Sequence, residues 1–226
     1  MPLMVLEALC VAAEKAQMRK AGSMTRDIDS DDSPVVPRTS RRTLLRAIAA
    51  APVAVSASPW GEALASLHTD YDDDPAKIVR TKAGRALSRD RYHRAESFLP
   101  TQQFGEWVHW HGYLYHAGIT AQLALSSHLL DVGFADDWCA RYIGLRVAKS
   151  LTYANATGFG HDCPDMARLA AVLTPYGRWN QVRLRGEPEP DDDGLTAPQV
   201  NVLLRNLLDR VRDVTGHPRP RGRRKR

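Results

Sequence analysis

Motifs that mark several common protein classes are missing from this sequence of 226 residues. It contains no phosphate-binding glycine loop, no serine nucleophile elbow and no dinucleotide fingerprint, which excludes the usual nucleotide-binding and hydrolase motifs. No internal repeat is present, and no alternation of apolar and polar residues is long enough to predict a β-sheet. The three cysteines, Cys10, Cys139 and Cys163, lack metal-binding spacing. The aspartate triplets 72–74 and 191–193 lack the spacing of a calcium loop.

Charge is distributed unevenly along the chain. The net charge is +5, from 31 Lys and Arg against 26 Asp and Glu, but six of the cations occupy the last eight residues. Without those residues and without residues 1–57, the chain has 17 basic and 20 acidic residues, a net charge of −3. All five tryptophans lie beyond residue 57, which indicates that the folded body begins there. Nucleic-acid binding therefore cannot be argued from the overall charge.

Apolar residues recur at helical spacing through the rest of the chain, so the sequence predicts an all-α fold. The expected architecture is an irregular bundle of about four or five helices, with a disordered N-terminal leader and a basic C-terminal tail. The expected domains are a leader at 1–57, a helical domain at 58–216 and a tail at 217–226. Helices are expected near Trp60 and at 75–97, 102–131, 136–155, 164–174 and 196–215.

Several of these helices have capping residues at their expected ends. Asp74 followed by Pro75 is typical of a helix start, and Thr196 is a typical cap for the last helix. Gly133 and Gly216 are typical of helix ends. We expect the core to form between the two long central helices and the last helix.

Other segments have weaker signals. The helix at 75–97 is expected to expose a strongly basic face and to turn its apolar residues inward: Ile78, Val79, Ala83, Ala86 and Leu87. Residues 178–185 fit either a strand or coil, and residues 186–194 are typical of an acidic linker.

Two adjacent arginines stand directly before a short apolar run, in the order Ser40-Arg41-Arg42-Thr43-Leu44-Leu45-Arg46. The run continues to Val55 and ends at Ala57, where small residues suit cleavage by a signal peptidase. It is too short to span a bilayer, which needs about 20 apolar residues. The order resembles a twin-arginine export signal, with Leu44 and Arg46 where Phe and Lys are usual.

This resemblance covers the leader alone and implies delivery to the periplasm, or secretion, by bacterial export machinery. Twin-arginine export usually carries proteins that are already folded, often with a cofactor, although no cofactor motif is present in this sequence. The alternative is an ordinary amphipathic helix with Leu44, Leu45 and Ile48 on one face, in a cytoplasmic protein. Met1 gives a long leader and Met24 a shorter one, and the residues do not decide between these two starts.

Histidines gather in the longest predicted helix, where imidazole groups suggest a metal site. The best-attested helical zinc pair is spaced at i and i+4. His109 and His116 instead lie about 10 Å apart along the helix axis, so we expect no metal there. His111 is expected on the buried face of the helix with Tyr115 and Gln122. Because buried polar groups need partners, these three residues are a candidate ligand pocket.

Cys163 precedes a predicted helix start, where a thiol can be activated, and His161 is close enough in sequence to be its base. This pair is a candidate reactive thiol site. The alternative is that Asp162 caps the helix while Cys163 packs. Cys139 and Cys163 are either two separate thiols or, after export, a disulfide.

The C-terminal tail supplies the candidate contacts with nucleic acid or an acidic partner: Arg219, Arg221, Arg223, Arg224 and Arg226. The leading expectation is an exported, soluble helical protein of unassigned activity that binds a small ligand between its helices. The alternative is a cytoplasmic nucleic-acid-associated or scaffold protein that uses the basic helix at 77–94 and the tail. The residues do not decide whether the protein is an enzyme.

Overall fold

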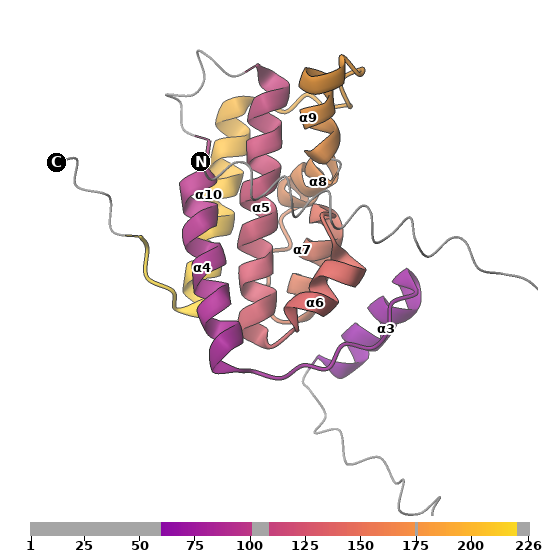
Figure 1. Ribbon diagram of the computed structural model, residues 1–226, viewed down its shortest axis with the longest axis vertical. Helices are drawn as coiled ribbons and strands as arrows, with labels where there is room; N and C mark the ends of the chain where they lie inside the picture. Colours follow the sequence, from indigo (N-terminus) through magenta and orange to yellow (C-terminus); the bar gives the residue numbers. More distant parts are fainter. Residues whose placement is uncertain (1–59, 101–108, 175, 221–226) are drawn as a thin grey trace, which may run out of the picture. The chain divides into compact units, whose positions relative to one another are not determined.

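The computed structural model describes residues 60–100, 109–174 and 176–220. All of them belong to one unit, Ala57–Arg226. Within these residues the chain forms eight α-helices, one π-helical turn and no strand (Figure 1). The all-α prediction is confirmed, although the helices are shorter and more numerous than the four or five expected. The predicted signal at 40–57 lies outside the described residues.

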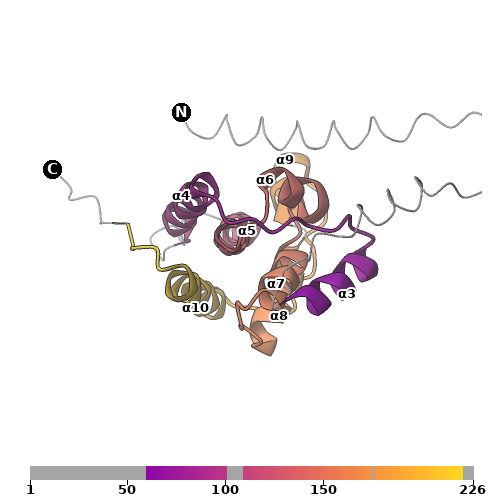
Figure 2. The same ribbon diagram turned by 90° about the horizontal axis from the view of Figure 1, so that it is seen from below.

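Three helices lie side by side along one edge of this unit, as both views show (Figures 1 and 2). They are α4 (Lys82–Phe98), α5 (Trp110–Val132) and α10 (Ala197–Thr215). α5 is the central element: it contacts α4 and α10 on one side and α7, α8 and α9 on the other. It is buried on all sides over its second half, from Ala124 to Val132. α5 is therefore the helix around which the others are packed.

The predicted start of α4 at Pro75 is wrong. The helix begins at Lys82, where the Thr81 hydroxyl accepts a hydrogen bond from the Gly84 amide at 2.9 Å. Residues 73–81 are not helical, because Asp73 and Asp74 bond to side chains of distant segments.

The predicted inward face of α4 is also wrong. Ala83 and Ala86 are exposed, whereas Ser88, Tyr92 and Ala95 are buried. Arg85, Arg89 and Arg94 are exposed, as the predicted basic face requires, whereas Arg91 is partly buried and bonds to Ser126 and Asp136. The small buried residues Ser88 and Ala95 allow α4 to lie close to α5.

The single helix predicted at 136–155 is broken in the structure. It consists of α6 (Asp136–Trp138), a π-helical turn (Cys139–Ile143) and α7 (Val147–Ala156). The break falls at Gly144, whose φ of 61° and ψ of −133° no helix accommodates. The part of this segment that packs against α5 is therefore α7, while α4 makes the larger contact with α5. The predicted stop at Gly133 is confirmed, since its amide donates to the Leu129 carbonyl.

The C-terminal half contains three further helices. α8 (Pro164–Leu173) begins and ends as predicted, with its apolar face buried. The expectation of strand or coil at 178–185 is wrong, because this segment is helix α9 (Tyr176–Arg185), with Trp179 fully buried. α10 has the predicted cap, in which the Thr196 amide donates to Gln199 Oε1 at 2.9 Å, and it ends at Gly216 as predicted.

The first described helix, α3 (Gly61–Tyr71), packs against α7. In both views it lies away from α4 and α10 (Figures 1 and 2). Leu64 is its only buried residue. We refer to residues 60–74, which comprise Trp60, α3 and the three aspartates after it, as the arm.

Candidate functional site

Helix α7 carries a lysine and a tyrosine one turn apart on the face that meets the arm. Their spacing of four residues places both on one side of the helix. Both side chains are buried although each ends in a polar group: 4% of Lys149 and 0% of Tyr153 is exposed. A buried ammonium group is costly unless it is paired, so this pair stands out from the rest of the core.

Both side chains bind a single carboxylate, that of Asp73 on the arm. Lys149 Nζ donates to Asp73 Oδ1 at 2.7 Å, and the Tyr153 hydroxyl donates to Oδ2 at 2.6 Å. Asp73 is as buried as the lysine, with 5% of its side chain exposed. Lys149 Nζ also lies 2.7 Å from Oδ2, so the ammonium group contacts both carboxylate oxygens, and both donors come from α7. Hydrogen bonds with an ionised partner are about twice as strong as neutral ones.

Aromatic rings surround this ion pair. Trp138 lies edge-on to Tyr153, with ring centroids 5.5 Å apart, and also contacts Phe134 and Tyr142. From the arm, the Tyr71 ring lies under the ammonium group, with its centroid 4.5 Å from Lys149 Nζ. Such a ring attracts a cation through its negative face. The arrangement keeps water from the pair and adds a second favourable contact for the positive charge.

The electrostatics of the site follow from this burial. Burial lowers the pKa of Lys149, and the hydrogen bond and charge of Asp73 oppose that shift. Burial, followed by the bond to Asp73, raises the pKa of Tyr153, so the hydroxyl stays a proton donor. The body side of the site is basic, with Arg146 near Lys149, whereas the arm carries four aspartates: Asp70, Asp72, Asp73 and Asp74. The body side therefore attracts anions.

Asp74 does not cap a helix as predicted, and Asp72 and Asp74 both have other roles in the structure. Asp74 accepts a hydrogen bond from the Tyr142 hydroxyl, and its carbonyl accepts one from Trp138 Nε1 at 2.9 Å. Asp72 ends α3 in the left-handed conformation, with a φ of 53°. The triplet thus joins the arm to the body.

A second buried polar cluster lies where α4, α5 and α10 meet. The Ser88 hydroxyl lies 2.7 Å from His217 Nε2 and 2.7 Å from the Ser127 carbonyl. Asp131 Oδ1 lies 3.9 Å from the same nitrogen of His217. A catalytic triad needs serine and aspartate on opposite nitrogens of the imidazole. Because Ser88 is also fully buried, this cluster joins helices and is not a nucleophilic centre.

The cluster anchors the first residues of the predicted tail. His217 is buried, His93 Nε2 lies 3.1 Å from the Pro218 carbonyl, and Arg219 pairs with Asp209. Of the five tail arginines predicted to contact nucleic acid, Arg219 is therefore engaged with the body. The other four, Arg221, Arg223, Arg224 and Arg226, lie outside the described residues.

The three residues of the predicted pocket on α5 contact three different segments. His111 Nδ1 lies 3.3 Å from Glu189, while its Nε2 is buried without a hydrogen-bond partner. The Tyr115 ring is 6.1 Å from that of Tyr176. Gln122 donates to the Gly144 carbonyl at 3.0 Å. Protein groups thus contact each member of the trio.

The predicted thiol site is held by Asn155, which bonds to both the amide and the carbonyl of His161. Burial and the nearby Arg210 lower the pKa of His161. Cys163 is the N-cap residue of α8, and Asp162 makes no cap bond there. No hydrogen bond joins His161 to Cys163 in this described segment. Cys163 and the buried Cys139 are both free thiols, and burial raises the pKa of Cys139 to about 12.

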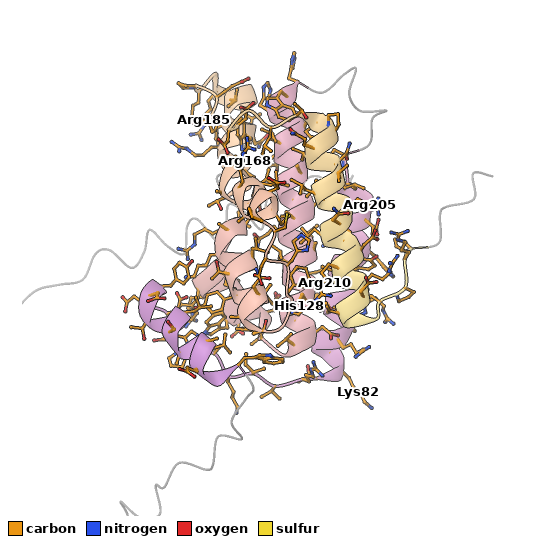
Figure 3. All side chains as sticks on the ribbon, turned by 180° about the vertical axis from the view of Figure 1, so that it is seen from behind. Lys82, His128, Arg168, Arg185, Arg205 and Arg210 are labelled. Atoms are coloured by element: carbon orange, nitrogen blue, oxygen red, sulfur yellow. The ribbon has the colours of Figure 1, made fainter. Side chains whose placement is uncertain are left out.

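The remaining buried histidine is His128 of α5, which is labelled near Arg210 of α10 in Figure 3. Its Nε2 lies 3.3 Å from the Thr157 hydroxyl, and its ring is 4.9 Å from that of Phe159. Burial lowers the pKa of His128 to about 4. The group is therefore a neutral core residue near pH 7.

Sequence reasoning missed the Lys149 site. The available signal was a lysine between the buried positions Val147 and Leu151, with a tyrosine four residues later. Nothing in the sequence pairs that lysine with Asp73, 76 residues earlier.

Within the described ranges, no group of three or more His, Cys, Asp or Glu residues is arranged to hold a metal ion. No helix in the described part of the chain is long and apolar enough to cross a membrane. The chain matches no protein-family model, no curated protein and no solved structure.

Proposed function

We propose that this chain is an exported helical protein whose folded body binds a small ligand between its helices, at the Lys149–Tyr153 site. The export part rests on the segment Ser40 to Ala57, whose order of residues resembles a twin-arginine signal. The location is then the periplasm or the medium. The binding part rests on one observation: two buried donors of the same helix bind the two oxygens of a single carboxylate.

Export is tested by intact mass. The full-length chain is expressed in a bacterium with twin-arginine machinery, and protein is recovered separately from the cytoplasm and the periplasm. The expected product is a periplasmic species that begins at Ser58. A double Arg41→Lys, Arg42→Lys variant should remain full-length in the cytoplasm, because the receptor reads the arginine pair. Full-length wild-type protein confined to the cytoplasm would contradict export.

Ligand binding is tested on the same material by native mass spectrometry. The wild-type chain should carry a small molecule that Lys149→Met has lost. Lys77→Met, at an exposed position outside the site, is the matched control and should keep it. Wild-type protein that is free of any bound molecule after gentle recovery from cells would count against the binding function.

One observation favours the second candidate, a nucleic-acid-associated protein. His217 and Pro218 fasten the start of the tail to α4, whose exposed side chains include four cations: Lys82, Arg85, Arg89 and Arg94. Figure 3 shows Lys82 at the end of α4, pointing away from the body. Because the tail starts from α4, the basic helix and the basic tail together form one positively charged surface for binding nucleic acid.

This candidate predicts DNA affinity that falls steeply with salt. Truncation after Pro220 removes five cations and leaves the His217 anchor in place. The slope of log affinity against log salt should then become shallower by up to about 4. A salt-independent affinity, or the same slope in both proteins, would dismiss this candidate.

A further inference from the structure

We propose that the Lys149–Tyr153 site takes an organic carboxylate with an aromatic or apolar body, and that the arm occupies this site as a competitor through Asp73. The inference rests on the ligand-binding function proposed above. It adds the chemical class of the ligand and the way in which access is controlled.

The two sides of the site belong to parts of the fold that are packed to different extents. Lys149 and Tyr153 are on α7, which packs against both α5 and α8. Asp73 is on the arm, whose helix buries Leu64 alone. Segments with few buried apolar contacts open at a lower free-energy cost than the core does. Opening also breaks the polar bonds of Asp73 and Asp74, so the open form is the minor one. The donors stay on α7 when the arm leaves, and the carboxylate leaves with the arm.

When the arm is open, the site selects for a carboxylate. Lys149 and Tyr153 then have two donors directed at one position, and a buried ammonium group without a partner favours an anion strongly. The positions of Lys149 Nζ and the Tyr153 hydroxyl fit one carboxylate, because both groups bind the carboxylate of Asp73 in the structure. Arg146 adds positive charge on the same side.

The aromatic residues beside the ion pair determine which apolar group the ligand carries next to its carboxylate. Phe134, Trp138 and Tyr142 remain on the body side when the arm opens, with the Trp138 ring centroid 5.2 Å from Phe134 and 5.1 Å from Tyr142. On the arm, His68 covers Trp138, with ring centroids 5.7 Å apart, and Tyr71 lies against Lys149 and Tyr153. A carboxylate attached to a ring or an apolar chain replaces both parts of the arm, the charge of Asp73 and the rings beside it.

If the arm competes with the ligand for the Lys149–Tyr153 site, ligand affinity depends on how often the arm is open. If only chains with an open arm bind the ligand, the apparent dissociation constant equals the intrinsic one divided by the open fraction. A substitution that weakens the arm without touching the donors should then tighten ligand binding. Leu64→Ala is such a substitution, because it removes the one buried apolar anchor of α3.

The experiment measures the affinity of the full chain for benzoate by titration calorimetry, with benzamide as the uncharged probe. Wild type should bind benzoate weakly, and Leu64→Ala should bind it about tenfold more tightly. Leu184→Ala, at an exposed position on α9, is the matched control and should bind like wild type. Lys149→Met should bind no benzoate, and benzamide should bind to none of the variants.

A second variant covers the case in which Leu64→Ala fails to fold. Asp73→Asn keeps the size of the side chain but removes its charge, so it should tighten benzoate binding in the same way. Asp70→Asn, on the exposed side of the arm, should not. Circular dichroism establishes that each variant is folded before it is titrated.

The outcomes separate the inference from the function on which it rests. Equal affinity of wild type, Leu64→Ala and Asp73→Asn would overturn the competing arm. Benzoate that binds to no variant, or benzamide that binds as well as benzoate, would overturn the carboxylate class. Neither result would decide the proposed function, which is judged by the molecule that the wild-type protein retains and Lys149→Met loses.

Discussion

Asp73 and Lys149 are 76 residues apart in the chain, yet their charged groups meet at 2.7 Å with almost no exposure to solvent. Removing one partner of a buried ion pair is strongly destabilising, because the other charge stays buried without compensation. Asp73→Ala should therefore lower the free energy of unfolding by about 3–5 kcal/mol in urea denaturation.

The matched control for that measurement is Asp70→Ala. Asp70 is exposed on the same arm and accepts a hydrogen bond only from Ser66, so its loss should change stability by no more than about 0.5 kcal/mol. Equal effects of the two substitutions would mean that the buried pair contributes nothing beyond a surface charge.

The second prediction concerns the contact of α5 with α9. A Cβ atom on Gly118 would overlap the side chain of Tyr176, whereas one on Gly177 would meet nothing within 4 Å. Gly118→Ala should cost about 1–3 kcal/mol through overpacking. Gly177→Ala should be neutral or stabilising by up to about 1 kcal/mol, because alanine favours a helix. Thermal denaturation of both variants tests this prediction. A loss of stability of the same size at each position would contradict the close contact between Gly118 and Tyr176.

The third prediction concerns pH. Burial lowers the pKa of His128 from 6.5 to about 4. Between these values the unfolded chain binds more protons at this residue than the folded chain, so stability falls as the pH falls from 6.5 to 4. The contribution is up to about 1.4 kcal/mol per pH unit.

Urea midpoints measured from pH 7 to pH 4 test this. His128→Gln should flatten the decline but not abolish it, since burial also lowers the pKa of His68, His161 and His217. His109→Gln, at an exposed position, is the control. A curve for His128→Gln that is as steep as that of wild type would contradict the assignment.

The fourth prediction concerns the tail anchor. Ser88→Ala removes the bonds to His217 and to the Ser127 carbonyl inside the core, and should cost about 1–3 kcal/mol. It should also speed tryptic cleavage at the tail arginines. Ser97→Ala, which loses an exposed bond to the Arg94 carbonyl, should do neither. Cleavage at an unchanged rate in Ser88→Ala would show that His217 does not depend on this hydroxyl.

Local signals predicted those helices whose ends and faces agree with their surroundings. α8 and α10 have proline or threonine starts and clean apolar stripes, and both were predicted correctly. α9 has weak helical periodicity and was missed, because Trp179 and the space at Gly118 determine its conformation. Tertiary packing of this kind overrides local preference and cannot be read from a short window.

The candidate site shows the same limit more strongly. The sequence suggested a helix cap at Asp74, since an aspartate before a proline usually serves that purpose. In the structure the triplet binds Lys149, Tyr142 and Tyr153 instead. A contact that joins residues 76 positions apart leaves no periodic pattern, so only the three-dimensional structure could identify it.

The distance in sequence between Ser88 and His217 also sets the order of events during synthesis. A ribosome adds about 5–20 residues per second, so His217 is made roughly 6–26 s after Ser88, from which it is separated by 129 residues. During that time α4 and α5 have no α10 to cover them, and Ser88 lacks its bond to His217. The apolar surfaces that α10 covers in the folded protein therefore stay exposed until the third helix arrives.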